Sequence, residues 1–158
     1  MTEAAFARFW AAARAAEPRL SPQPAPAWAF GADPGQADEL LGLVLAGIKT
    51  ATSSLLREYA AAGEKLPQAG DLSILLDGAG SPRAVIETTD VTVVRFGEVD
   101  AEHARAEGED DRTLESWRRE HERFWRRKSR NESGFAPDLP VVCERFDLVY
   151  AAPTPLSE

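Results

Sequence analysis

The sequence predicts an α+β fold, in which helices pack around a small twisted sheet or barrel. Three observations support this prediction. The chain has 158 residues and is 44% hydrophobic, which is sufficient for one buried core. Apolar residues recur at three- and four-residue spacing near the amino terminus and again after residue 100. Between and after these segments lie apolar runs bounded by Gly, Pro and Asp, which are typical of strands.

Residues 2–16 predict the first helix, because their apolar side chains fall on one helical face. That face consists of Phe6, Phe9, Trp10 and Ala13. Four prolines between residues 18 and 26 end the helix, since proline fixes φ and lacks the amide hydrogen. An extended connection to Trp28 and Phe30 is therefore expected.

The second helix has clear start and stop signals. Asp33 is a capping residue, Pro34 suits the first turn, and Gln36 stands at capping-box spacing. Gly47 is placed where the helix would turn left-handed and end. The apolar face between them consists of Leu40, Leu41, Val44, Leu45 and Ile48. A short helix is expected next, capped by Ser53 or Ser54 and ended by Gly63.

The remaining elements alternate between strand and helix patterns. Residues 72–77 and 83–96 predict two antiparallel strands, because the segment between them is rich in hairpin residues. A helix capped by Asp100 and ended by Gly108 follows. The last elements are a longer helix over 113–128 and a strand over 139–150.

The predicted elements divide the chain into three parts. Residues 28–150 form the domain itself. Residues 1–27 supply a helix and a proline-rich connection, which are too short to fold alone and are expected to pack on that domain. Residues 151–158 read as a frayed tail.

Composition excludes several classes of protein. No uncharged apolar run approaches the roughly 20 residues that a membrane helix needs. The amino terminus carries Glu3 and Arg8 where a signal peptide would be apolar, which favours a cytoplasmic protein. Cys143 is the single cysteine and lies in an apolar run, so a buried strand thiol is expected and an internal disulfide is excluded. The formal net charge of −8 disfavours non-specific binding of duplex DNA.

Charge changes sign sharply near residue 111. Residues 98–111 hold seven acids and one base, whereas residues 112–130 hold eight bases and three acids. One interpretation is a solvated helix whose charges match its dipole. The alternative is a phosphate-binding strip beside Trp117 and Trp125, suited to single-stranded nucleic acid. The strip would consist of Arg118, Arg119, Arg126 and Arg127.

The sequence predicts no metal site and no cofactor. His121 shares an apolar stripe with Trp117, and the preferred interpretation is a hydrogen-bonded core residue. His103 is the only other histidine, which leaves too few imidazoles for a histidine-rich metal site. The acids of 107–111 offer oxygen ligands for Mg²⁺. An exposed acidic loop is the preferred interpretation of that cluster.

Gly47, Lys49 and Thr52 are the most informative group in the chain. A lysine just past a helix end needs a charged partner or a lowered pKa if its ammonium is semi-buried. A Walker loop is excluded because the Gly-Lys-Ser/Thr sequence is missing. The nucleophile elbow of serine hydrolases, Gly-x-Ser-x-Gly, is also missing, so Ser53 and Ser54 are poor candidates for that nucleophile.

These residues resemble the ASCH domain family of the PUA-like superfamily. The pattern Gly-x-Lys-x-x-Thr over 47–52 carries the resemblance, together with ordered motifs at 70–71, 86–91, 106–112 and 114–121. The match spans roughly residues 28–150 and implies a PUA-like small β-barrel with packed helices. The family is associated with RNA, and some of its members resemble enzymes.

The resemblance implies two activities. One relative type is an amidohydrolase that removes the acyl group of N4-acetylcytidine; its lysine, threonine and glutamate correspond by motif to Lys49, Thr52 and Glu107. In that reading Lys49 takes the proton of Thr52, and Glu107 protonates the departing amine with a pKa raised by neighbouring acids. The other type is a single-stranded RNA endoribonuclease, again with Lys49 at its motif position.

A second set of residues is expected to hold the substrate. It consists of Gly47, Ser53, Tyr59, Glu87, Arg112, Trp117 and His121. A salt bridge between Glu87 and Arg112 is an equal alternative for those two.

The sequence therefore leaves three functional hypotheses open. The first is hydrolysis of a modified nucleoside, which needs no phosphate-binding surface and leads narrowly because the chain is acidic. The others are cleavage of single-stranded RNA and non-catalytic RNA binding through the arginine strip. The natural substrate, the metal requirement and the oligomeric state stay open. A cover over the barrel mouth, formed by residues 2–16 and the proline-rich link, would change the size of substrate admitted.

Overall fold

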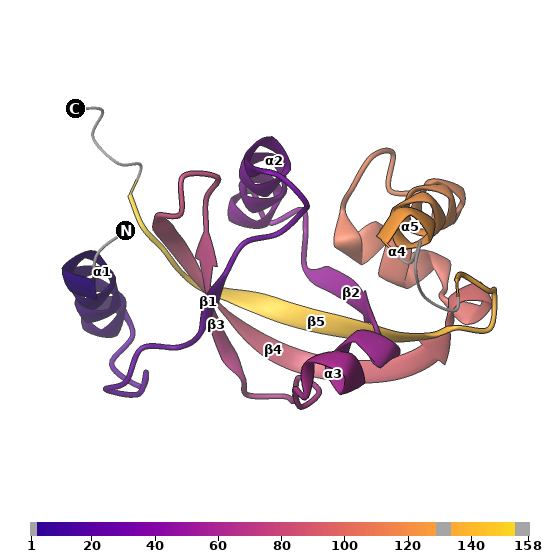
Figure 1. The fold of residues 1–158 in the computed structure, drawn as a ribbon. Helices are drawn as coiled ribbons and strands as arrows, with labels where there is room; N and C mark the ends of the chain where they lie inside the picture. Colours follow the sequence, from indigo (N-terminus) through magenta and orange to yellow (C-terminus); the bar gives the residue numbers. More distant parts are fainter. Residues whose placement is uncertain (1–2, 129–133, 154–158) are drawn as a thin grey trace.

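The computed structural model describes residues 3–128 and 134–153. Five α-helices and five strands occur in these residues (Figure 1). In chain order they are α1 (Glu3–Ala16), β1 (Ala27–Trp28), α2 (Pro34–Leu45), β2 (Ala51–Leu55), α3 (Leu56–Ala62), β3 (Leu72–Leu76), β4 (Pro82–Arg95), a 3-10 turn (Phe96–Glu98), α4 (Ala101–Glu107), α5 (Leu114–Lys128) and β5 (Pro140–Ala151). The predicted α+β class is confirmed. None of the described helices combines the length and apolar composition required to cross a bilayer.

The five strands form one sheet in the order β1-β3-β4-β5-β2. β1 runs parallel to β3, and the other neighbours are antiparallel. β4 and β5 are the long central strands, with 14 and 12 residues. Register shifts in their ladder at Val85/Ile86 and Thr88/Asp90 mark bulges, which bend paired strands.

The expected closed barrel is wrong, because the sheet is open. β3 pairs with the first half of β4, whereas β2 pairs with the first half of β5, at the other end of the β4–β5 ribbon. β1 extends the sheet beyond β3 by only two residues, Ala27 and Trp28. The two edge strands therefore lie at opposite ends of the ribbon and have no partner strand in common.

The helices cover the sheet in three groups. In the view of Figure 1, α2 and the α4–α5 pair lie above the ribbon, α3 lies below it, and α1 lies at the far left. Separate apolar clusters lie under α2 and under the α4–α5 pair: α2 packs on Leu75 and Ile86 of the sheet, and α4 with α5 packs on Val141 and Cys143. The burial of Cys143 confirms the expected strand thiol.

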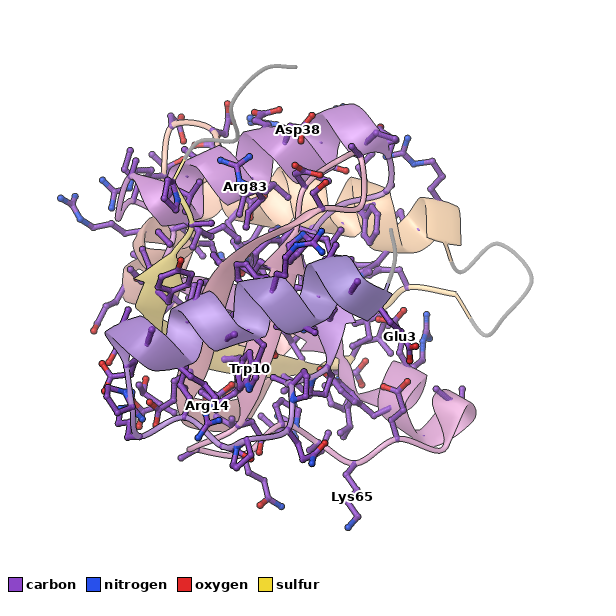
Figure 2. The ribbon with its side chains drawn as sticks, turned by 90° about the vertical axis from the view of Figure 1, so that its left-hand side faces the viewer. Glu3, Trp10, Arg14, Asp38, Lys65 and Arg83 are labelled. Atoms are coloured by element: carbon purple, nitrogen blue, oxygen red, sulfur yellow. The ribbon has the colours of Figure 1, made fainter. Side chains whose placement is uncertain are left out.

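The first helix packs as the sequence predicts but away from the α4–α5 end of the sheet. Phe9, Trp10 and Ala13 of α1 are buried against Ile74 and Val85. Figure 2 shows α1 crossing in front of the strands, and Figure 1 places it at the opposite end from α4 and α5. The helix α1 therefore does not lie over the α4–α5 end of the sheet. The described part of 151–158 also differs from a frayed tail, because Ala151 ends β5 and the Ala152 amide donates to Arg83 O at 2.9 Å.

The predicted cap of α2 is confirmed, whereas the predicted caps of α3 are wrong. Asp33 caps α2 as predicted, since its Oδ1 accepts from Gln36 N at 2.8 Å. Gly47 adopts φ 77°, which confirms the left-handed turn after the helix. Ser53 and Ser54 do not cap α3, because both lie in β2, where pairing with β5 holds the chain extended. Glu58 instead accepts from Leu55 N at 3.2 Å.

Candidate functional site

Two segments far apart in the sequence meet at the candidate site: the turn after α2 and the carboxyl end of α4. The Thr50 amide donates to Ala106 O at 2.7 Å. Gly108 ends α4 at φ 72°, and a Cβ at this position would lie 2.7 Å from Ile48 O. Only glycine fits such a conformation and approach. This junction holds Lys49 beside Glu107.

Lys49 is buried, with 1% of its surface exposed. Its Nζ lies 2.6 Å from Glu109 Oε2, 2.9 Å from Ala51 O and 3.4 Å from Glu107 O. The Glu107 side chain follows at 3.6 Å. An ammonium carries three hydrogens, and here all three point to acceptors. The sequence predicted that a semi-buried ammonium here would need a charged partner. In the structure Lys49 has two, Glu107 and Glu109.

Glu107 is the centre of the buried network. Its Oε2 accepts from Ser53 Oγ at 2.7 Å, from Trp117 Nε1 at 2.6 Å and from His103 Nε2 at 2.7 Å. Its Oε1 faces Lys49 and His121 Nε2, the latter at 3.4 Å. Five side chains from four parts of the chain thus converge on one carboxylate.

The expected direction of the Glu107 pKa is wrong. Burial by itself would raise the pKa, but the Lys49 charge and hydrogen bonds from His103 and His121 outweigh it. The pKa of Glu107 is consequently held well below its ordinary value. The neighbouring acids act elsewhere: Glu109 pairs with Lys49, and Asp111 accepts from the Thr113 amide and hydroxyl at 2.9 and 2.6 Å.

His121 stacks on Trp117, with ring centroids 4.3 Å apart and an interplanar angle of 18°. Its Nδ1 lies 2.9 Å from Trp117 O, and its Nε2 faces Glu107. Burial lowers the pKa of His121, but the hydrogen bond and charge of Glu107, followed by the charge of Glu109, reverse this effect. The net result is a raised pKa.

The network forms the wall of a cleft of about 890 Å³ between the start of α2, the start of β2 and α5. Five predicted site residues line it together: Lys49, Thr52, Ser53, Glu107 and His121. Its apolar surface comes from Phe30, Leu40, Phe124 and Trp125. The volume falls in the range of ligand pockets for small molecules.

Thr52 contributes a hydroxyl to the cleft that has no hydrogen bond to any residue within 3–128 or 134–153. Its neighbour Ser53 is committed to Glu107. Lys49 does not bond to Thr52, because its hydrogens point to Ala51 and to the two glutamates. Of the two hydroxyls, Thr52 is the one available to a substrate.

The other predicted substrate-binding residues lie outside this cleft. Gly47 forms the turn before Lys49, and Trp117 is buried beneath His121. Tyr59 lies on α3, where burial raises the pKa of its hydroxyl despite a hydrogen bond with Ser54.

Glu87 and Arg112 do not form the predicted salt bridge. Glu87 pairs with Arg19 at 2.8 Å, on the first connection of the chain. Arg112 instead donates from Nε to Arg105 O at 3.2 Å. The contact with Arg19 could not be predicted from local patterns, because the two residues are 68 positions apart.

Within the described residues, the two tryptophans expected beside the arginine strip offer little stacking surface, whereas Arg126 lies 4.8 Å from the ring centroid of Phe135. Trp117 and Trp125 are 5% and 2% exposed, and both belong to the core under α5. The arginines are largely paired: Arg119 faces Asp110 and Glu120, and Arg126 bonds to Glu122 at 2.7 Å. Arg130 lies outside the described residues. The solvated-helix interpretation of α5 fits this arrangement better.

Sequence reasoning missed two members of the network, Glu109 and His103. Glu109 was grouped with the acidic loop, although it stands two residues after Glu107 and pairs with Lys49. His103 stands four residues before Glu107, and this spacing places both side chains on one face of α4. The spacing could have predicted their contact. Within the described ranges, no group of three acidic, histidine or cysteine side chains is arranged to hold a metal ion.

Comparisons with known proteins agree on one family. The model of the ASCH domain matches residues 26–150. The crystal structure of an ASCH domain from Lactobacillus crispatus JV V101 is 29% identical, with a TM-score of 0.83 over 94% of this chain and 96% of that chain. Protein EF3133 from Enterococcus faecalis V583 is 34% identical, with a TM-score of 0.83 over 93% and 89% of the two chains. No curated protein matches the chain. The resemblance drawn from the sequence motifs is confirmed.

Proposed function

The chain belongs to the ASCH domain family, a family of RNA-related and hydrolase modules, and we propose that it hydrolyses the amide of N4-acylcytidine-like nucleosides. One observation carries this proposal. A buried lysine, held between two glutamates, lines the same cleft of about 890 Å³ as a threonine hydroxyl that makes no hydrogen bond within the described residues. Together they supply a cation and a nucleophile for attack on a carbonyl.

The walls of the cleft suit a flat heterocycle. Phe30 and Phe124 line the α2 and α5 sides, and the buried Trp125 contributes only a small edge to the lining. Lys49, Thr52 and Ser53 converge at one wall, and further charged side chains line the α2 and α5 sides. Small-molecule sites likewise combine apolar surface with convergent polar groups that fix the ligand's orientation.

The charges of the cleft favour a substrate without phosphate. Its cations are Lys49, Arg127 and the protonated His121, and Lys49 is already paired. Five acids line the same cleft: Asp33, Glu39, Glu107, Glu109 and Glu120. This excess of negative charge repels a phosphate group. It therefore supports a free nucleoside over a nucleotide or an RNA strand.

Lys49 acts in this proposal by stabilising charge. A lysine whose three hydrogens are bonded has no lone pair with which to take a proton from Thr52, the role implied by resemblance. Glu109 is its most accessible partner, with a side chain 31% exposed. The acyl oxygen of the substrate displaces Glu109 and receives a hydrogen bond from Nζ. The released carboxylate then accepts the proton of the Thr52 hydroxyl as it attacks the carbonyl carbon.

The experiment compares Thr52→Ala with Thr50→Ala, a substitution of the exposed threonine two residues earlier. The purified variants are incubated with N4-acetylcytidine, and formation of cytidine is followed by its ultraviolet absorbance. Loss of turnover in Thr52→Ala but not in Thr50→Ala is expected. Equal turnover in both variants would contradict the proposal. Cleavage of a single-stranded RNA without turnover of the nucleoside would favour a ribonuclease.

A further inference from the structure

We propose that His121 is the catalytic proton donor to the amine that leaves when the amide is cleaved. This inference rests on the proposed function and assigns the step that the family resemblance gives to Glu107. Glu107 is unsuited to it, because its Oε2 already accepts three hydrogen bonds and its side chain is only 2% exposed. The donor must instead be a protonated group that reaches the cleft.

The contacts of His121 favour a hydrogen on both ring nitrogens. Nδ1 lies 2.9 Å from the Trp117 carbonyl oxygen, which can only accept. Nε2 lies 3.4 Å from Oε1 of Glu107, whose ionised carboxylate also only accepts. A neutral imidazole has one hydrogen and would leave one of these pairs with two facing acceptors. The imidazolium satisfies both.

The charged groups around the ring support this protonation state. Glu107 from α4 and Glu109 from the following loop are the anions that face it, and both favour the imidazolium. Lys49 is the opposing cation and is itself paired with these two glutamates. With His121 charged, the group holds two anions and two cations. The ring of His103 bonds to the other oxygen of Glu107.

His121 is the histidine with access to the cleft. Its side chain is 16% exposed and lines the cleft, whereas that of His103 is 7% exposed and lines a separate cavity of about 340 Å³ beside Cys143. The contact from Nε2 to Glu107 is longer than a normal hydrogen bond of 2.7–3.2 Å. The Nε2 hydrogen is thus held loosely enough to pass to a substrate atom.

Cleavage of the amide moves one electron pair and one proton to the leaving nitrogen. When the bond between the acyl carbon and the exocyclic nitrogen breaks, its electron pair goes to the nitrogen. That nitrogen takes the Nε2 hydrogen of His121 and leaves as a primary amine, while the ring becomes neutral with a lone pair on Nε2. Water then hydrolyses the acyl ester on Thr52, which frees the hydroxyl and gives a carboxylic acid. Ionisation of this acid returns a proton to His121, and the proton that Glu109 took from Thr52 is released to solvent.

The test uses two substrates that differ in their need for a proton. N4-acetylcytidine has an amine leaving group, which departs only when protonated, whereas 4-nitrophenyl acetate releases a stable phenolate without one. We expect His121→Gln to lower kcat for the amide about 100-fold or more, the usual range for a general acid, with at most a few-fold change for the ester. His103→Gln removes a neighbouring contact to Glu107 and is expected to affect both substrates equally.

The outcomes separate the two proposals. If the wild-type protein turns over neither compound, the proposed function fails, and the role of His121 fails with it. If the wild type is active but His121→Gln loses both activities equally or neither, the proposed function stands and only the assignment of His121 is overturned. A second readout is the imidazole proton resonance of His121. Its titration midpoint should lie above pH 6.5 in the wild type and fall in Glu107→Gln; an uncharged ring at pH 6.5 would overturn the assignment.

Discussion

Lys49 and Glu107 are 58 residues apart in the sequence, and their side chains meet in the core at 3.6 Å from Nζ to Oε1. Each is 1% exposed. Because a buried charge is tolerated only when it is paired and hydrogen-bonded, neither residue can occupy this place alone. The pair joins the turn after α2 to the end of α4, and so the site and the fold depend on the same contact.

Replacement of Lys49 by Met should destabilise the protein by about 3–5 kcal/mol, since two carboxylates would lose their buried cation. Chemical denaturation measures this loss. In the double variant Lys49→Met/Glu107→Gln the cost should be clearly less than the sum of the single costs, because the uncompensated charge is removed. Strict additivity would show that the two side chains are not coupled.

The free energy of unfolding should fall on both sides of a window between about pH 4.5 and 6.5. The pKa of Glu107 is lowered in the folded protein, so its stabilisation is present above 4.5 and is lost as the pH falls toward the folded pKa. The pKa of His121 is raised, so its stabilisation is complete below 6.5 and is lost as the pH rises through the folded pKa. Urea denaturation from pH 3 to 9 measures both limbs. In His121→Gln the decline above pH 6.5 should be reduced, and an unchanged alkaline limb would refute the assignment.

Cys143 should be unreactive in the folded protein. Burial, followed by the charge of Glu107, raises the pKa of its thiol to about 12, and the thiolate is the form that reacts. A disulfide reagent at pH 8 should therefore label Cys143 slowly under native conditions and rapidly in denaturant. Equal rates in the two conditions would contradict the buried position in β5.

Local patterns predicted most elements because their signals lie within a few residues of one another. Asp33 with Gln36 fixed the start of α2, and Asp100 with Gly108 bounded α4. The open sheet could not be predicted in this way, because it depends on which half of β5 pairs with β2. The two serines of β2 were misassigned as helix caps for the same reason.

The candidate site was predictable to the extent that a motif carried it. Lys49, Thr52 and Glu107 line one cleft, and the catalytic roles that the resemblance implies for them stay a prediction. The direction of the Glu107 pKa was not predictable, since it depends on His103 and His121, which reach the carboxylate only after α4 and α5 pack together. Nearby acids in the sequence were a poor guide, because Glu109 turns toward Lys49.

The most direct test of the account is the release of acetate and cytidine from N4-acetylcytidine, followed by proton NMR. We predict that the wild-type protein forms the two products in equal amounts and that Lys49→Ala does not. Lys65→Ala, which removes an exposed lysine outside the cleft, serves as the matched control and should retain wild-type turnover. An inactive wild-type protein, or equal activity in Lys49→Ala and Lys65→Ala, would contradict the account.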